Sequence, residues 1–192
     1  MSALWSVEKM PFNIKSDSLL PSVVLVEFGY FEDERGWFSE FYRSSEFEKL
    51  GLPSSFGQVN RSFSKNSGTI RGLHLQLPPK EQGKFVCCTK GSIFDVAVDV
   101  RVGSDTFGMW TSYELDDTNR KALWIPSGFA HGFQTLVEDT EVMYLTTNEY
   151  APEFERSVSW GDPEIGIDWP IGNPTLSSRD NEAPPLGNVK LE

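Results

Sequence analysis

The sequence predicts an all-β fold of the sandwich, jelly-roll or barrel type, with only a few short helices. Short runs rich in β-branched and aromatic residues recur along most of the chain. Gly, Pro, Asn and Asp separate these runs at a spacing of about 8–12 residues, which is typical of antiparallel sheets joined by tight turns. One segment carries helix signals, and it is too short to define the fold.

The expected strands begin after Pro21, and residues 1–21 show no clear pattern. The strands are expected at residues 22–28, 37–42, 56–64, 69–77, 84–89, 92–101, 107–115, 122–125, 132–137 and 141–148. Within one of them, Phe94 and Val96 share one face, and Asp95 and Asp99 share the other, because neighbouring side chains alternate. The second face is partly polar, so it must meet solvent or line a site.

The helix signals lie at residues 45–51. Ser45 can cap the first turn, Glu48 is at the capping-box position, and Gly51 can end the helix. The last part of the chain, residues 160–192, is rich in proline and turn formers. We therefore expect an irregular C-terminal wrap with one or two short helical turns.

Length, charge and cysteine usage limit the functional classes. The 192 residues fit one domain, expected to span residues 1–192. The net charge of −11 argues against non-specific binding to nucleic acid, which depends on a basic surface. No apolar run approaches the ~18 residues of a membrane span, and residues 1–10 lack the apolar core of a signal peptide. Adjacent Cys87 and Cys88 point to opposite faces of a strand, so no disulfide and a cytoplasmic location are expected.

Histidine is scarce, and both copies lie in distinctive segments. His74 lies on an expected strand, and His131 lies in a loop that leads into a strand. Arg71 is three residues before His74 and should face the other way, unless Gly72 introduces a bulge. A single histidine is more often a hydrogen-bonded structural group than a catalyst, so these residues alone establish no function.

Other candidate residues have ordinary structural explanations when each is taken alone. Asp180 is typical of a solvated loop, and Lys84 is typical of a strand edge. Tyr144 is typical of a core residue with its hydroxyl at the rim. The sequence has no Gly-rich phosphate loop, no GxSxG and no CxxC pair. Two histidines are few for zinc, whereas an iron site of two histidines and one carboxylate stays possible.

An ordered set of motifs covers most of the chain, from about Val24 to Leu186. The motifs are Asp33-Glu-Arg-Gly36, Gln58-Val-Asn60, Arg71-Gly-Leu-His74, Gln82-Gly-Lys84, Asp95-Val-Ala-Val-Asp99, Thr106-Phe-Gly108, Leu123-Trp-Ile-Pro126, Gly128-Phe-Ala-His-Gly-Phe133, Ile165-Gly-Ile-Asp-Trp-Pro170 and Leu176-Ser-Ser-Arg-Asp180. Each is weak alone, but the ordered set is highly specific. Together they resemble the dTDP-4-dehydrorhamnose 3,5-epimerase family, a branch of the cupin jelly rolls.

The resemblance implies a cupin-type double-stranded β-helix, that is, a jelly roll, that works without a metal or other cofactor. The usual first cupin motif, His-x-His, reads His74-Leu-Gln76 here, so the metal site looks lost. The implied reaction is epimerisation at C3 and/or C5 of a dTDP-4-keto-6-deoxy sugar, in deoxysugar biosynthesis of the dTDP-rhamnose type. A proton next to the ketone is removed, and another is delivered from the opposite face through an enolate.

Matching motif positions imply a role for each catalytic residue. His74 would be the base, and Asp180 would orient it and stabilise its charge. Tyr144 would be the acid on the far face. Lys84 would hold the enolate oxygen, which favours the transition state over the ketone.

The resemblance also implies a nucleotide site and a homodimer. Arginine suits the diphosphate, and Arg35, Arg71 and Arg61 are candidates. The other expected substrate-binding residues are Phe38, Glu40, Gln58, Asn60, His131, Glu149 and Arg179. In this family the first strands, here residues 22–42, are exchanged between two subunits. Arg35 and Glu40 would then serve the partner's site.

One position departs from the family pattern, and two other functional classes stay open. Glu149 stands where relatives often have an aromatic residue, one of a pair that includes the residue stacking on the base, so a different nucleotide is conceivable. The second class is a metal-dependent cupin enzyme that uses His74, His131 and a carboxylate. The third class is a non-catalytic sugar-binding jelly roll.

Overall fold

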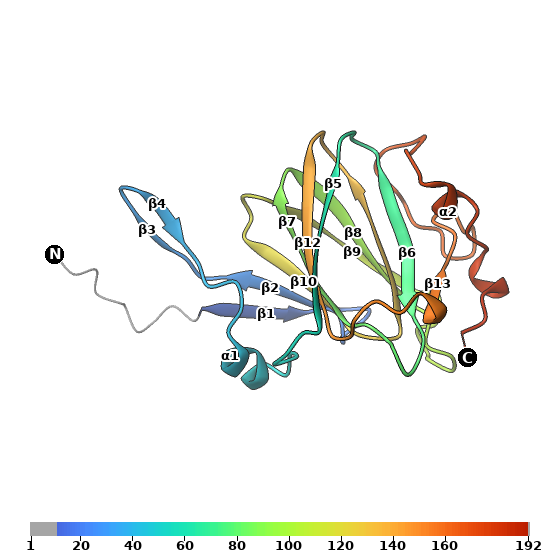
Figure 1. The fold of residues 1–192 in the computed structure, drawn as a ribbon, viewed down its shortest axis with the longest axis horizontal. Helices are drawn as coiled ribbons and strands as arrows, with labels where there is room; N and C mark the ends of the chain where they lie inside the picture. Colours follow the sequence, from blue (N-terminus) through green and yellow to red (C-terminus); the bar gives the residue numbers. More distant parts are fainter. Residues whose placement is uncertain (1–10, 192) are drawn as a thin grey trace.

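The computed structural model describes residues 11–191 and is built almost entirely of short strands (Figure 1). The strands are β1 (Phe12–Ser16), β2 (Val24–Phe28), β3 (Phe31–Asp33), β4 (Gly36–Phe38), β5 (Gln58–Ser64), β6 (Ile70–Gln76), β7 (Lys84–Lys90), β8 (Ser92–Asp99), β9 (Trp110–Asp116), β10 (Lys121–Ile125), β11 (Phe129–Thr135), β12 (Thr140–Thr146) and β13 (Glu155–Ser157). The helical elements are α1 (Ser44–Lys49), η1 (Pro152–Phe154), α2 (Ser178–Asn181) and η2 (Leu186–Asn188). Residues 1–10, where no signal peptide is expected, lie outside the described part.

Two antiparallel sheets form the body of the molecule. One has six strands in the order β1-β2-β10-β7-β12-β5, and the other has five in the order β13-β6-β11-β8-β9. A separate two-stranded ribbon joins β3 and β4. The predicted all-β jelly roll is therefore confirmed. None of the helices within residues 11–191 is long and apolar enough to cross a bilayer.

Several element boundaries differ from the predicted ones. The sequence does not predict β1 or β13, and the strand expected at residues 37–42 is only the short β4. The proposed cap at Ser45 is wrong, because α1 begins at Ser44 and its N-cap is Arg43, without a side-chain hydrogen bond. Gly51 does end the helical segment, with a φ of 73° and its amide bonded to the Glu48 carbonyl.

Side-chain alternation divides the apolar residues into three layers. Between the sheets, the layer includes Leu25, Val86, Ile93, Ala97, Phe133 and Val142. On the outer face of the six-stranded sheet, Phe85 and Trp124 pack against Phe47 of α1. On the outer face of the five-stranded sheet, Val96 packs with Ile165 of the C-terminal segment. Both outer faces are thus covered by apolar layers. Polar side chains on the inner faces therefore lie in the space between the two sheets, together with the central core.

The β3–β4 hairpin projects from the body on one side of the molecule (Figure 1). Its aromatic side chains are largely open to solvent, with Trp37 56% and Phe38 60% exposed. At the base of the hairpin, the Arg120 guanidinium lies 3.8 Å from the ring centre of Tyr30 and 5.3 Å from that of Trp37. These cation–π contacts tie the hairpin to the turn between β9 and β10.

The bulge considered at Gly72 is present. His74 pairs with His131, and Arg71 pairs with Phe133. The register shifts between these two pairs, because three residue steps on β6 face two on β11. Gly72 has a φ of 119°, in the region that favours glycine. Because of the shift, Arg71 and His74 line the same cavity instead of facing opposite ways.

We expect Gly72→Ala to destabilise the protein by about 2 kcal/mol or more, through backbone strain and overpacking. A Cβ at this position would lie 2.6 Å from the Gly132 Cα and 2.6 Å from the His131 carbonyl oxygen. Urea denaturation measures the difference. Gly161→Ala is the matched control, because nothing lies within 4 Å of its Cβ. Equal stability of the two variants would contradict the argument.

Candidate active site

A cavity of about 230 Å³ lies between inner-facing strand residues and helix α2. It is lined by Ser62, Arg71, His74, Lys84, His131, Phe133, Tyr144, Ser177, Arg179 and Asp180. The four predicted catalytic residues are therefore together, although they come from β6, β7, β12 and α2. The cavity is close in size to small-molecule sites, which begin at about 300 Å³.

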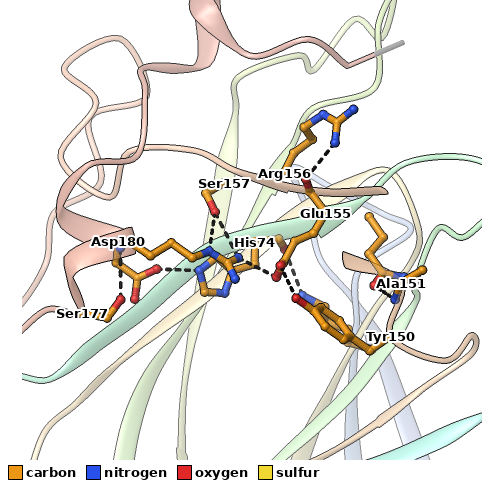
Figure 2. A network of polar contacts seen from close by, with 11 residues as sticks. His74, Tyr150, Ala151, Glu155, Arg156, Ser157, Ser177 and Asp180 are labelled. Atoms are coloured by element: carbon orange, nitrogen blue, oxygen red, sulfur yellow. Dashed lines mark hydrogen bonds and ion pairs between the residues drawn. The ribbon is translucent and has the colours of Figure 1, made fainter. Parts of the chain in front are cut away.

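His74 and Asp180, which both line the cavity, are hydrogen-bonded to each other, as Figure 2 shows. The His74 Nε2 lies 2.6 Å from the Asp180 Oδ1. Ser177 caps α2, and its Oγ accepts a hydrogen bond from the Asp180 amide at 3.1 Å. Burial raises the pKa of Asp180, but the hydrogen bonds and charge of His74, the Ser177 hydroxyl and the charge of Arg179 outweigh burial and lower it overall. Asp180 is thus an anion that can orient a base.

Lys84 lies in the interior rather than at a solvated strand edge. Its side chain is 8% exposed, and its Nζ donates to the His74 carbonyl oxygen at 2.9 Å. Burial lowers the pKa of Lys84 to about 8, against the charges of Glu155 and Asp95, which raise it. The amine is a cation at neutral pH, held where an oxygen that becomes negative can meet it.

Tyr144 faces His74 from the opposite sheet. It lies on β12 of the six-stranded sheet, whereas His74 lies on β6 of the five-stranded sheet. Burial raises the pKa of the Tyr144 hydroxyl, and the charge of Arg71 opposes this only in part. The phenol therefore stays protonated at neutral pH. A base and an acid on opposite walls can act on the two faces of one bound molecule.

His131 is buried beside this group and has its own carboxylate. Its Nε2 lies 2.8 Å from the Asp95 Oδ1, and β11 pairs His131 directly with His74. Burial lowers the pKa of His131, although Asp95 opposes the effect. Asp95 was expected only as part of a polar strand face. Its full burial excludes contact with solvent, and its contact with His131 places the Asp95 carboxylate directly behind the cavity wall.

Arg71 and Ser62 form the wall next to β5. The Arg71 Nε donates to the Ser64 Oγ at 3.1 Å, and its Nη2 donates to the Phe63 carbonyl at 2.9 Å. Ser62 has a buried hydroxyl with no hydrogen-bond partner among the residues that the structure describes. The sequence interpretation missed Ser62, although it alternates with Gln58 and Asn60 on one strand face.

The amide residues of β5 lie near this wall. The Gln58 Nε2 donates to the Asn60 Oδ1 at 2.7 Å, and the Gln58 Oε1 accepts from the Tyr150 amide at 2.8 Å. Glu149, just before it, is exposed in the loop after β12. Gln58, Asn60 and Glu149 do not line the cavity itself.

Three predicted binding residues lie on or just after the projecting hairpin. Arg35 is paired with Asp33 at 2.5 Å, and its side chain is 89% exposed. Phe38 is at the end of β4, and Glu40 pairs with Arg43. None of the three lines the cavity of its own chain. Arg61 faces away from the cavity and pairs with Glu141.

The residues do not support a metal-dependent cupin site. Within residues 11–191, no three His, Cys, Asp or Glu side chains are grouped so that they could hold a metal ion. Each imidazole instead has its Nε2 beside a different carboxylate, Asp180 for His74 and Asp95 for His131. The iron site of two histidines and one carboxylate, which the sequence left possible as an alternative, is therefore not formed among the described residues.

Comparisons with known proteins point to one family. The family model described as dTDP-4-dehydrorhamnose 3,5-epimerase matches residues 17–188. A protein of that name from Sinorhizobium fredii is 48% identical over 168 residues, covering 87% of this chain and 86% of the relative.

Solved structures agree with the family match. The dTDP-6-deoxy-D-glucose-3,5-epimerase of Legionella pneumophila, in complex with dTDP-4-keto-L-rhamnose, superposes with a TM-score of 0.88 at 40% identity, covering 93% of this chain and 95% of that one. A 3′-monoepimerase from Streptomyces bikiniensis, in complex with dTDP-quinovose, has a TM-score of 0.83 at 36% identity, covering 90% of this chain and 87% of that one. The chain belongs to the dTDP-4-dehydrorhamnose 3,5-epimerase family.

Proposed function

We propose that this protein epimerises a dTDP-4-keto-6-deoxyhexose at C3 and C5, in the biosynthesis of a dTDP-rhamnose-type sugar. The observation that carries the proposal is the arrangement of the cavity. The His74–Asp180 pair and Tyr144 lie on opposite sheets, and the amine of Lys84 is buried beside them. The family match and the ligand of the Legionella pneumophila structure support the choice of sugar.

In this mechanism, His74 removes the proton next to the ketone, and Asp180 stabilises the imidazolium that forms. Electrons move from the broken C–H bond into the carbonyl, and the oxygen becomes an enolate. The ammonium group of Lys84 interacts more strongly with this anion than with the neutral ketone, so it lowers the barrier. Tyr144 then donates its proton to the carbon from the opposite face, which inverts the centre.

The nucleotide part of the substrate is assigned to the surroundings of this group. The guanidinium of Arg71 and the unpartnered hydroxyl of Ser62 are suited to diphosphate oxygens. His131 is the neighbouring donor, and Gln58 and Asn60 extend the polar surface along β5. The exposed position of Glu149 leaves a carboxylate, in place of an aromatic ring, near the expected base.

The active unit in this proposal is a homodimer with exchanged hairpins. Arg35 and Phe38 lie on a hairpin that projects from its own subunit, and neither lines its own cavity (Figure 1). A second copy related by a two-fold axis would receive them, with Glu40, at its site. The aromatic side chains of Trp37 and Phe38 would then be buried at the interface.

We assign the reaction to the cytoplasm. Both cysteines, Cys87 and Cys88, are free and buried thiols, which suits a reducing compartment. The remaining alternative is a sugar-binding jelly roll without catalysis. A binder has no need of a base, an acid and a cation around one cavity, so the catalytic interpretation is preferred.

The direct test is proton NMR of dTDP-4-keto-6-deoxyglucose with the protein in heavy water. We expect deuterium at C3 and C5, because each inversion takes its new proton from solvent-exchanging groups. His74→Ala should abolish exchange at both carbons. Exchange at one carbon only would identify a mono-epimerase. Binding of the sugar without any exchange would contradict the enzymatic proposal and favour the sugar-binding class.

A second prediction concerns the pH dependence of Lys84. The pKa of about 8 means that Lys84 is charged below this pH and neutral above it, so kcat should fall as the pH rises past about 8. Lys84→Arg should keep its positive charge at high pH, because the arginine pKa is above about 12. The fall in kcat should therefore occur at a higher pH than in wild type. Lys84→Met should lower kcat about 10²- to 10³-fold. An unchanged alkaline limb in Lys84→Arg would contradict the assignment.

A third prediction tests hairpin exchange by complementation. Arg35→Ala/Phe38→Ala damages the hairpin, and His74→Ala damages the cavity. Each homodimer should be inactive. A purified heterodimer of the two should recover about half of the wild-type rate, because one of its two sites combines an intact cavity with an intact hairpin. No recovery in a folded heterodimer would contradict the exchange.

A further inference from the structure

Helix α2 carries Asp180, but it is too short to hold that residue in place by itself. It spans only Ser178–Asn181, and a single turn is not stable in isolation. The backbone is anchored some residues away on each side, where the Ile70 amide donates to Thr175 and the Ser159 amide donates to Pro184. Between these anchors, the position of Asp180 depends on side-chain contacts.

Arg179 provides such a contact, because its guanidinium binds the edge strand β13. One terminal nitrogen lies 2.5 Å from the Glu155 Oε1. Its Nε and Nη2 also donate to the Ser157 Oγ at 3.2 and 3.1 Å. Ser157 pairs in register with His74, so this contact joins α2 to the strand next to the catalytic histidine.

Glu155 is itself held on its second oxygen. The Tyr150 hydroxyl donates to the Glu155 Oε2 at 2.7 Å, as Figure 2 shows, and the Glu155 side chain is only 17% exposed. Burial raises the pKa of Glu155, but the hydrogen bonds of Arg179 and Tyr150 outweigh it and lower the pKa overall. The carboxylate is therefore a fixed anion with both oxygens in use.

We propose that Glu155 is a positioning residue of the epimerase, whose ion pair with Arg179 sets helix α2 so that Asp180 meets His74. Glu155 touches neither reacting group. It acts through Arg179 and the Asp180 that follows, and Ser157 and Tyr150 fix the geometry of the ion pair.

Arg179 is expected from the sequence to bind substrate, but here its charge is neutralised by the Glu155 carboxylate. Arg71 differs, because the protein hydrogen bonds of its guanidinium go to the neutral oxygens of Ser64 and Phe63.

The kinetic test compares Glu155→Gln, Arg179→Met and the double variant with wild type in the deuterium-exchange assay. This kinetic comparison rests on the proposed function. Loss of the Glu155–Arg179 ion pair misplaces Asp180, so kcat should fall about ten- to a hundredfold in each single variant. KM should stay within about twofold, because no substrate contact is removed. The double variant should lose no more than the worse single variant, since both remove one interaction.

The opposite kinetic pattern would overturn the proposal. If Arg179 binds the substrate directly, Arg179→Met raises KM, and Glu155→Gln frees the guanidinium and leaves kcat unchanged or lowers KM. Glu153→Gln is the matched control, because it removes an exposed carboxylate two residues away. It should leave kcat and KM unchanged.

A second measurement needs no substrate, so it tests the positioning role of the Glu155–Arg179 ion pair even if the proposed function fails. The chain has two histidines, so only two sets of ring-nitrogen NMR signals have to be assigned. In Glu155→Gln and Arg179→Met, the His74 signals should move, and the His131 signals, set by Asp95, should stay. His74 signals that are unchanged in both folded variants would overturn the proposal. Absence of deuterium exchange in wild type would instead count against the epimerase assignment alone.

Discussion

The space between the two sheets has to contain a hydrophobic core and a polar site at the same time. Alternation along each strand sends every second side chain into this space, and the same strands serve both purposes. On β7 the inward row runs from Lys84 to Val86 and Cys88, and on β12 it runs from Tyr144 to Val142. The site residues are therefore extensions of packed rows, which restricts their rotamers and holds them at fixed separations.

Charge in this space is balanced locally and does not follow the net charge of the chain. The chain as a whole carries −11, yet Arg71, Lys84 and Arg179 line one cavity. Each of the buried or partly buried carboxylates around them has a cation or an imidazole as partner. Burial lowers the pKa of Lys84 to about 8, and the charges of Glu155 and Asp95 oppose this effect. Since Arg179 is neutralised by Glu155, Arg71 and Lys84 are the cations that an acidic protein can present here to an anionic ligand.

Strand patterning explains which parts of the fold could be predicted. The alternation around Asp95 predicts both faces of β8, and the glycine at position 72 indicates the bulge. β13 has three residues and no detectable period, so only its pairing with β6 defines it as a strand. Ser45 was an incorrect cap because α1 begins one residue earlier, at Ser44, and its one buried residue, Phe47, packs in the apolar layer outside the six-stranded sheet.

For the site, sequence patterns alone did not separate His74, Lys84, Tyr144 and Asp180 from ordinary structural residues, and the motif resemblance brought them together. Burial of Lys84 was not predictable, because the first residue of a strand can face either environment. The partnerships of His131 with Asp95 and of Arg179 with Glu155 depend on strand register and on the path of the C-terminal segment. Such long-range contacts have no local signature in the sequence.

The His74–Asp180 hydrogen bond joins residues 106 positions apart, and its second member belongs to α2, late in the chain. During synthesis on the ribosome, the strands emerge first and can pair before that turn is made. A nascent or prematurely terminated chain can thus form most of its sheets before the His74–Asp180 hydrogen bond exists. Under the proposed mechanism, synthesis of α2 becomes a condition for acid–base chemistry. Fragments that stop before α2 would then be folded in large part and yet catalytically silent.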